Sequence, residues 1–308
     1  MPVIPEPGLL KSKVKEFLIY CEARNLSPNS LRAYRADLNE FVDVSCGSEA
    51  VSSQVNRKLI RGFVVRLHES GIKLTSVRRK LASVKSFCKW LDGEGLLDSR
   101  LIESIPGPRR RHDLPDVPNE SEVKRLLDGE ILTASPERDR VILELLYGSG
   151  LRASEVIGIN IDDFRDEDVI VVRGKGRKER FVIFGDFARG AILAWLPVRA
   201  RLLTKFKLET AALLFSVSPN QSVERLDVRS IGRVVKAIAE ARGFDPKKWH
   251  PHLLRHACAT HMHDHEGPLQ AVAALLGHAR LSTAQIYTRV SVGRMMQTYN
   301  KAHPHARS

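Results

Sequence analysis

The sequence predicts a mostly α-helical protein with a small antiparallel β-sheet, arranged as two domains. Its length of 308 residues exceeds that of one typical domain. Apolar residues recur at helical spacing in the first third of the chain, whereas two β-branched runs interrupt the helical pattern later. A segment rich in proline and arginine separates the two parts, which makes it the expected domain boundary.

Four helices are expected in the N-terminal domain, residues 1–108. Ser27-Pro28 supplies an N-cap and a proline at the first helical position, and an apolar stripe follows it from Leu31 to Val42. A second stripe runs from Val77 to Leu91, and weaker patterns at 9–23 and 56–69 predict two further helices. We interpret the stripes as core. Basic residues beside the second stripe are candidate DNA contacts: Arg78, Arg79 and Lys85.

Residues 109–118 are expected to form an exposed linker. Prolines at 106, 108, 115 and 118 disfavour a continuous helix or a central strand. The linker begins with three arginines, Arg109, Arg110 and Arg111. This run is either a solvated connector or a strap that follows DNA phosphates, and the sequence favours neither.

The C-terminal domain, residues 119–308, mixes helices with a hairpin. Asp139 to Tyr147 reads as a buried helix that ends at Gly148-Ser149-Gly150, and Arg152 begins another. The runs at 169–172 and 181–184 predict two antiparallel strands joined by a polar, glycine-containing turn. The remainder is expected to be helical, apart from a turn at 218–222.

The composition indicates a polyanionic partner. Lys and Arg number 49 against 36 Asp and Glu, which gives a formal charge of +13 and a pI near 9.8. Neither a membrane-spanning stretch nor a signal-peptide pattern is present in the sequence, so we expect a cytoplasmic protein. The four cysteines lack CxxC spacing, which indicates neither a disulfide framework nor a cysteine zinc site.

Two short basic segments suit phosphate chemistry but are weak signals alone. Arg152 lies just after a glycine stop, and by itself it would be expected to pair with Glu155 on the surface. Lys175 lies between two glycines at the hairpin tip, close to Arg173 and Arg177. The spacing of a phosphate-binding P-loop is absent there, so an isolated Lys175 would be interpreted as solvated charge.

The segment from His250 to Tyr287 is far more specific. His252 and Arg255 are three residues apart and share one face of a helix. A second helix is expected to end at Gly277 and to present His278, and Tyr287 follows nine residues later. The order and spacing of these residues are the signal.

The ordered series of motifs resembles the tyrosine recombinases, the lambda-integrase-like family, and is most similar to the bacterial Xer recombinases. The motifs are Gly150-Leu151-Arg152-Ala153-Ser154-Glu155, Gly174-Lys175-Gly176, His252-Leu253-Leu254-Arg255-His256, Leu276-Gly277-His278 and Gln285-Ile286-Tyr287-Thr288. Segments 27–34 and 299–304 are also similar. His263, His265 and Pro268 depart from the pattern, which leaves the local helix geometry there open.

The resemblance implies a two-domain DNA clamp, with a SAM-like core-binding domain and an α+β catalytic domain of the DNA breaking-rejoining type. It implies a site-specific recombinase that cuts and rejoins DNA through a covalent 3′-phosphotyrosyl intermediate, in DNA integration or in chromosome or plasmid dimer resolution. The partners it implies are double-stranded DNA and three further copies of the chain, or a related recombinase, in a tetramer on two sites that exchanges strands through a Holliday junction.

Carried over residue by residue, the resemblance makes Tyr287 the nucleophile, Arg152 and Arg255 the phosphate clamps, and Lys175 the general acid. His252 and His278 complete the catalytic set, and Glu155 and His256 are expected to support it. Two guanidinium groups can hold the nonbridging oxygens bidentately without a change of protonation, so no metal, ATP or other cofactor is expected. A phenol with a free pKa of about 10 is a tolerable leaving group, which makes the intermediate reversible.

Other functions remain open from the sequence. The chain could be a DNA-binding protein with an inactive recombinase-like site, or a DNA-relaxing enzyme of the type IB topoisomerase kind. A histidine-dense tract from His250 to His265 could bind zinc, and the aspartates at 162, 163, 166 and 168 could bind a nuclease metal. We disfavour both, because no HExxH motif occurs and the aspartates are expected in a polar loop.

The C-terminal tail carries an apolar ridge if residues 291–301 are helical. The ridge comprises Val290, Val292, Met295, Met296 and Tyr299. It either packs on its own domain or, as the Xer resemblance implies, docks on a neighbouring protomer. The sequence-based interpretation favours the second arrangement, because a terminal helix is easily exchanged between identical subunits.

Overall fold

The computed structural model forms two compact units, Met1–Leu114 and Pro115–Ser308. It describes residues 7–46, 55–98, 117–166, 168–174, 179–218, 220, 222–265, 267, 272–273, 275–276 and 289–306. Among these residues no helix is both long enough and apolar enough to cross a membrane. Each unit has a hydrophobic core of its own, so each is described separately.

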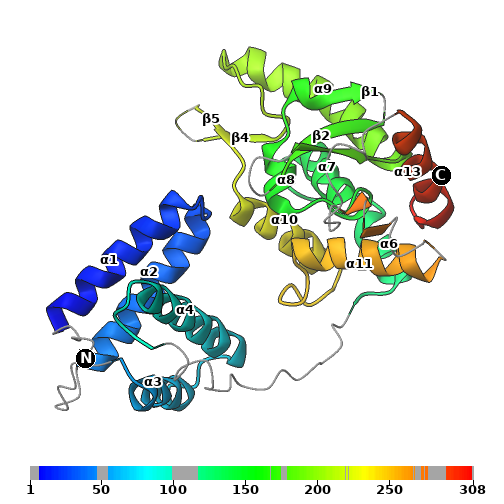
Figure 1. The fold of residues 1–308 in the computed structure, drawn as a ribbon. Coiled ribbons are helices and arrows are strands. Elements are labelled where there is room, and N and C mark those ends of the chain that lie inside the picture. Colours follow the sequence, from blue (N-terminus) through cyan, green and yellow to red (C-terminus); the bar gives the residue numbers. More distant parts are fainter. Residues whose placement is uncertain are drawn as a thin grey trace. The chain divides into compact units, whose positions relative to one another are not determined.

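The N-terminal unit contains four described helices, as the apolar stripes predict (Figure 1). They are α1 (Pro7–Ala23), α2 (Pro28–Cys46), α3 (Arg57–Glu69) and α4 (Leu74–Gly93). The side chain of Asn56 caps α3 by accepting the N–H of Leu59 at 2.9 Å. Phe41 and Phe63 are fully buried and meet edge to face with centroids 5.2 Å apart, which joins α2 to α3.

The C-terminal unit is mainly helical. Its described helices are α6 (Glu120–Leu127), α7 (Pro136–Tyr147), α8 (Ala153–Gly158), α9 (Asp186–Phe206), α10 (Val228–Ala241), α11 (Pro251–Asp264) and α13 (Arg289–Ala302). Helix α7 is covered on all sides, and it packs against α9, α10 and α11. This burial accounts for the apolar sequence from Val141 to Tyr147, which only Glu144 interrupts. The expected helix over 139–147 is therefore confirmed, with an earlier start at Pro136.

A three-stranded antiparallel sheet lies in the same unit (Figure 1). Strands β2 (Val169–Arg173) and β3 (Glu179–Ile183) form the predicted hairpin, with Val172 opposite Arg180. The expectation of a polar loop before β2 is wrong in part, because Phe164–Asp166 form β1 beside β2. The residues before β1, Ile161–Asp163, form a short 3₁₀ helix, η1.

A second, two-stranded sheet was also missed by the sequence analysis. Strands β4 (Phe215–Val217) and β5 (Val223–Arg225) pair on either side of the predicted turn at 218–222. Each strand has three residues, which is too short for an alternating pattern to be recognised in the sequence. The turn itself is therefore placed correctly, but its flanks are extended rather than helical.

Helix α13 packs on β3 and α11 of its own unit. Tyr299 is 3% exposed and belongs to the core, and Gly185 approaches its ring so closely that a Cβ there would lie 2.6 Å from the phenol oxygen. In the structure Tyr299 therefore packs on its own domain, whereas the sequence favoured docking of the C-terminal ridge on a neighbouring protomer. Met296 packs partly against the same core, and the side chains of Val290, Val292 and Met295 lie outside the described ones.

Candidate active site

The turn between α7 and α8 places Arg152 at the start of a helix. Gly150 has φ +57°, a conformation that favours glycine, and it lets the chain reverse within a few residues of Tyr147. A Cβ on Gly150 would lie 2.4 Å from Cδ2 of Leu276 and 3.1 Å from Sγ of Cys258. The glycine therefore allows this turn to pack directly against the segment at Leu276.

Glu155 is the centre of an arginine cluster. Its side chain is only 2% exposed, and it accepts the backbone N–H of Arg152 at 2.8 Å and an Nη1 hydrogen bond from the same residue at 2.9 Å. Arg180 donates to Oε2 of Glu155 at 3.1 Å, and Nη1 of Arg255 lies 3.8 Å from the same oxygen. The expected pair of Arg152 and Glu155 is present, but it is not a surface pair because the carboxylate is buried.

Burial and charge act in opposite directions on Glu155. Burial would raise its pKa, but Arg180, the Arg152 backbone N–H, and the charges of Arg152 and Arg255 together lower the pKa below the ordinary value. Arg255 has a pKa lowered to about 10, because it is buried and lies near Arg152. The cluster therefore places three guanidinium groups around one buried carboxylate, which leaves an excess of positive charge.

The two candidate phosphate clamps differ in exposure. The Arg152 side chain is 35% exposed, whereas that of Arg255 is 6% exposed. Arg255 donates to the carbonyl oxygens of Gly150 and Leu276, the second at 2.6 Å. These contacts fix its guanidinium between the α7–α8 turn and the Leu276 segment.

Helix α11 carries the remaining described residues of the candidate site. His250 caps this helix by accepting the N–H of Leu253 at 3.0 Å, and burial lowers the pKa of His250. His252 and His256 are exposed on α11, on either side of the buried Arg255. The nucleophile candidate Tyr287, together with Lys175 and His278, lies outside the described residues.

Sequence analysis missed Arg180, which the structure brings into the cluster. Its side chain is 12% exposed and donates to Glu155 and, at 2.9 Å, to the carbonyl oxygen of Leu275. A signal was available: the apolar run of β2 predicts a strand covered on both faces, and Arg180 stands opposite Val172 of that strand. A charged residue at such a position needs a buried partner.

The candidate DNA-contacting residues have varied surroundings. In the N-terminal unit Arg78 is exposed, Lys85 is half-buried, and Arg79 pairs with the buried Asp37. On the hairpin, Arg173 pairs with Asp163 and Glu179, each at 3.1 Å. Arg79 and Arg173 thus have structural partners. The others, Arg109, Arg110, Arg111 and Arg177, lie outside the described residues.

Histidines of the tract considered for zinc have other partners. His261 is buried between the Tyr147 hydroxyl, 3.0 Å from Nδ1, and the carbonyl oxygen of Pro118, 2.9 Å from Nε2. His265 contacts Glu120 at 2.7 Å. Over the parts of the chain that the structure describes, no group of three potential metal-ligating residues is found.

Two of the aspartates considered for a nuclease metal have structural partners. Asp163 accepts the N–H of Asn160 at 2.8 Å and pairs with Arg173, and Asp168 pairs with Arg189. The contact of Asp163 with Asn160 is typical of an aspartate in a turn, whereas Asp168 pairs with an arginine of α9.

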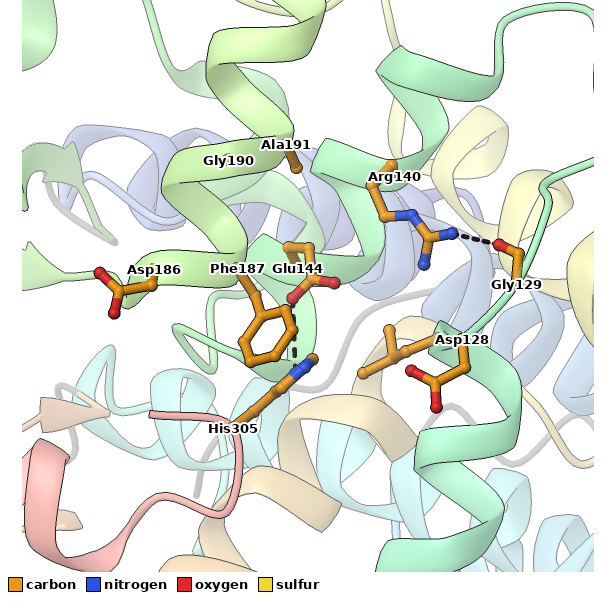
Figure 2. Close-up of a pocket in the computed structure, with 10 residues that line it drawn as sticks. Asp128, Gly129, Arg140, Glu144, Asp186, Phe187, Gly190, Ala191 and His305 are labelled. Carbon is orange, nitrogen blue, oxygen red and sulfur yellow. Dashed lines mark hydrogen bonds and ion pairs between the residues drawn. The ribbon is translucent and has the colours of Figure 1, made fainter. Parts of the chain in front are cut away.

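A separate pocket of about 390 Å³ lies between α7, α9 and the C-terminal turn (Figure 2). Glu144 and His305 face each other in this pocket, with Oε2 of Glu144 and Nδ1 of His305 3.5 Å apart. The ring centroids of His305 and Phe187 are 3.7 Å apart. Burial raises the pKa of Glu144 to about 7 and lowers that of His305 to about 4. None of the lining residues belongs to the arginine cluster.

Comparison with known proteins identifies the family. Residues 118–294 match the phage integrase family model, and residues 14–95 match the phage integrase N-terminal SAM-like domain. The chain belongs to the phage integrase family. It is a tyrosine recombinase, an enzyme that breaks and rejoins DNA strands.

Curated relatives match over nearly the whole chain. A tyrosine recombinase XerC of Pelobacter propionicus is 38% identical over 97% of this chain and 97% of its own length. One from Chlorobaculum tepidum is 36% identical over 94% of both chains. The expected membership of this family, with Xer recombinases as relatives, is confirmed.

Solved structures share the fold at lower identity. The XerH site-specific recombinase in a post-cleavage complex with its difH substrate has a TM-score of 0.68, at 21% identity over 96% of this chain and 84% of that one. A lambda integrase dimer bound to a core site has a TM-score of 0.62, at 15% identity over 91% and 98% of the two chains. The expected fold class, a mostly helical protein with a SAM-like domain and an α+β catalytic domain, is confirmed.

Proposed function

We propose that this recombinase cleaves DNA with the hydroxyl of Tyr287, while Arg152 and Arg255 hold the phosphate under attack. The convergence of these two arginines on the buried Glu155 is the observation that carries the proposal. Two guanidinium groups, fixed in place before DNA arrives, lower the energy of the charge that develops on the nonbridging oxygens. Glu155 holds Arg152 through two hydrogen bonds and thereby orients it.

The strand is cut by a single substitution at phosphorus. The Tyr287 oxygen forms a bond to phosphorus as its proton passes to His252, and the bond to the 5′-oxygen breaks as that oxygen takes a proton from Lys175. His278 donates a hydrogen bond to the phosphate or orients Tyr287. The product is a 3′-phosphotyrosyl link and a free 5′-hydroxyl. Attack by another 5′-hydroxyl reverses the steps. Rejoining therefore needs no ATP, and no step of the proposed reaction uses a metal ion.

The substrate proposed is double-stranded DNA carrying a specific site. The excess of basic residues supports a DNA partner, and the names of the XerC and XerH relatives support site-specific recombination. We propose that four protomers, or a combination with a related recombinase, act on two sites in dimer resolution or DNA integration. A chromosomal or plasmid substrate would place the enzyme in the cytoplasm. Residues 1–108 and 119–308 would contact one duplex, joined by the linker at 109–118.

Trapping the covalent intermediate tests this proposal. A cognate site, selected from a random DNA pool, is nicked so that the cut strand loses its 5′-hydroxyl fragment. Wild-type protein is expected to form an adduct that survives denaturation, also in excess EDTA, and Tyr287→Phe is expected to bind the site without forming it. An adduct with Tyr287→Phe would contradict the assignment. Binding without any wild-type adduct would indicate an inactive site, and relaxation without recombination would indicate a topoisomerase.

A further inference from the structure

Arg180 joins two parts of the C-terminal unit that are far apart in the sequence. One nitrogen of its guanidinium, Nη2, donates to Glu155 at 3.1 Å, and the other, Nη1, donates to the carbonyl oxygen of Leu275 at 2.9 Å. Its side chain is 12% exposed, and that of Glu155 is 2% exposed. The contacts are therefore shielded from solvent. Hydrogen bonds to charged groups are stronger in such an environment than in water.

Each segment that Arg180 connects also holds a proposed catalytic residue in place. Glu155 holds the side chain and the backbone of Arg152. Leu275 precedes Leu276, whose carbonyl oxygen accepts a hydrogen bond from Arg255. Arg180 itself lies on β3, and Lys175 precedes β3 by four residues in the sequence.

The planar fork of arginine is needed for this geometry. Its two terminal nitrogens point in fixed directions, so one side chain can hold a carboxylate and a carbonyl oxygen together. A lysine has one nitrogen on a flexible stem, and it would retain the charge but not the pair of fixed hydrogen bonds.

We propose that Arg180 is a positioning residue for DNA cleavage, which sets the position of Arg152 through Glu155 and aligns it with the segment at Leu275 and Leu276. It does not touch the phosphate. The inference rests on the proposed roles of Arg152 and Arg255. A shift of about 1 Å in a reacting or clamping group lowers the rate by about 100-fold, so loss of this link is expected to slow cleavage without weakening DNA binding.

The charge of Arg180 has a consequence that a purely structural residue would lack. Glu155 faces Arg152 at the N-cap of α8, Arg180 of β3 and Arg255 of α11. Among these groups, Arg180 contributes most to the lowering of the Glu155 pKa. Without Arg180, burial would raise the pKa of Glu155, so the carboxylate would be protonated at a higher pH. Cleavage should then decline at a higher pH on the acidic side of its profile.

Arg138 offers a closely matched control. Its side chain is 15% exposed, and it pairs at 2.7 Å with Asp139, whose side chain is 2% exposed. It also donates to the carbonyl oxygen of Phe215 at 3.3 Å. Arg138 therefore makes the same two kinds of contact as Arg180, with partners other than those described above for Arg152 and Arg255.

The experiment compares Arg180→Met, Arg180→Lys and Arg138→Met in the full chain. Adduct formation on the nicked site is measured in a single turnover from pH 5.5 to 8.5, and rates are divided by the folded fraction. Arg180→Met is expected to bind DNA normally and to cleave about 10- to 100-fold more slowly, with its acidic limb at higher pH than in wild type. Arg180→Lys is expected to cleave more slowly with an unshifted limb, and Arg138→Met to cleave at the wild-type rate.

Two results would overturn the role of Arg180. One is a wild-type cleavage rate for Arg180→Lys, which decides the question even if Arg180→Met does not fold. The other is an Arg180→Met rate and pH profile equal to those of Arg138→Met after correction for folded protein. Failure of the underlying function is recognised separately, because wild-type protein would then form no adduct or Arg152→Lys would cleave normally.

Discussion

Replacing Gly150 with alanine tests whether the turn beside the arginine cluster is as tightly packed as the structure indicates. Two costs are expected. An alanine at φ +57° loses about 1–2 kcal/mol of stability from its left-handed backbone. Its Cβ would also lie 2.4 Å from Cδ2 of Leu276. A side-chain tip usually rotates away, but Leu276 is 4% exposed, so overpacking adds about 1–3 kcal/mol.

Gly243 provides the control for the backbone cost alone. It has φ +75°, and nothing lies within 4 Å of a Cβ placed there. Gly243→Ala should therefore lose only about 1–2 kcal/mol, and Gly150→Ala about 2–5 kcal/mol in total. The difference between the two variants isolates the contact with Leu276.

The assay is urea unfolding followed by tryptophan fluorescence. A Trp90→Phe background removes the tryptophan of the N-terminal unit, so that Trp195 and Trp249, both buried in the C-terminal unit, report on that unit. Gly150→Ala should also cleave DNA more slowly, because displacing Leu276 moves a carbonyl oxygen that holds Arg255. Equal losses of stability in the two glycine variants would refute the reasoning.

Two further predictions concern charge. Arg152→Lys and Arg255→Lys should each lower the single-turnover rate of cleavage by about 100-fold or more, with DNA affinity nearly unchanged. Equal losses of cleavage rate and DNA affinity would indicate that these arginines only anchor the DNA. Burial raises the pKa of Glu144 from 4.5 to about 7. The stability that protonated Glu144 contributes to the folded protein is therefore complete below pH 4.5 and is lost as the pH rises through 7. Glu144→Gln should therefore exceed wild type by up to about 3 kcal/mol in urea unfolding at pH 8 and match it near pH 4.5, and a gap independent of pH would contradict this.

The helices and the hairpin could be predicted because their patterns are local. The apolar stripe from Val77 to Leu91 and the capping signal at Ser27-Pro28 depend only on neighbours in the sequence. Strands β1, β4 and β5 have three residues each, and their pairing depends on partners that no local pattern reveals. For the same reason the sequence does not reveal that Tyr299 packs beside Gly185.

The candidate site could be predicted by residue type but not by surroundings. The sequence places Arg152, Glu155 and Arg255 in motifs, yet the burial of Glu155 and the enclosure of Arg255 arise from contacts between segments about 100 residues apart. Arg180 was missed because its partners, Glu155 and Leu275, are distant in the chain.

The most direct measurement of the central claim is the position of the DNA-linked residue. The adduct formed on the nicked site is digested with nuclease and trypsin, and the modified peptide is sequenced by mass spectrometry. The tryptic peptide Leu281–Arg289 contains Tyr287 together with Ser282, Thr283 and Thr288, so fragment ions distinguish the four hydroxyl groups. The account predicts a nucleotide on Tyr287 alone. A nucleotide on any other residue, or an unmodified peptide from a verified adduct, would contradict it.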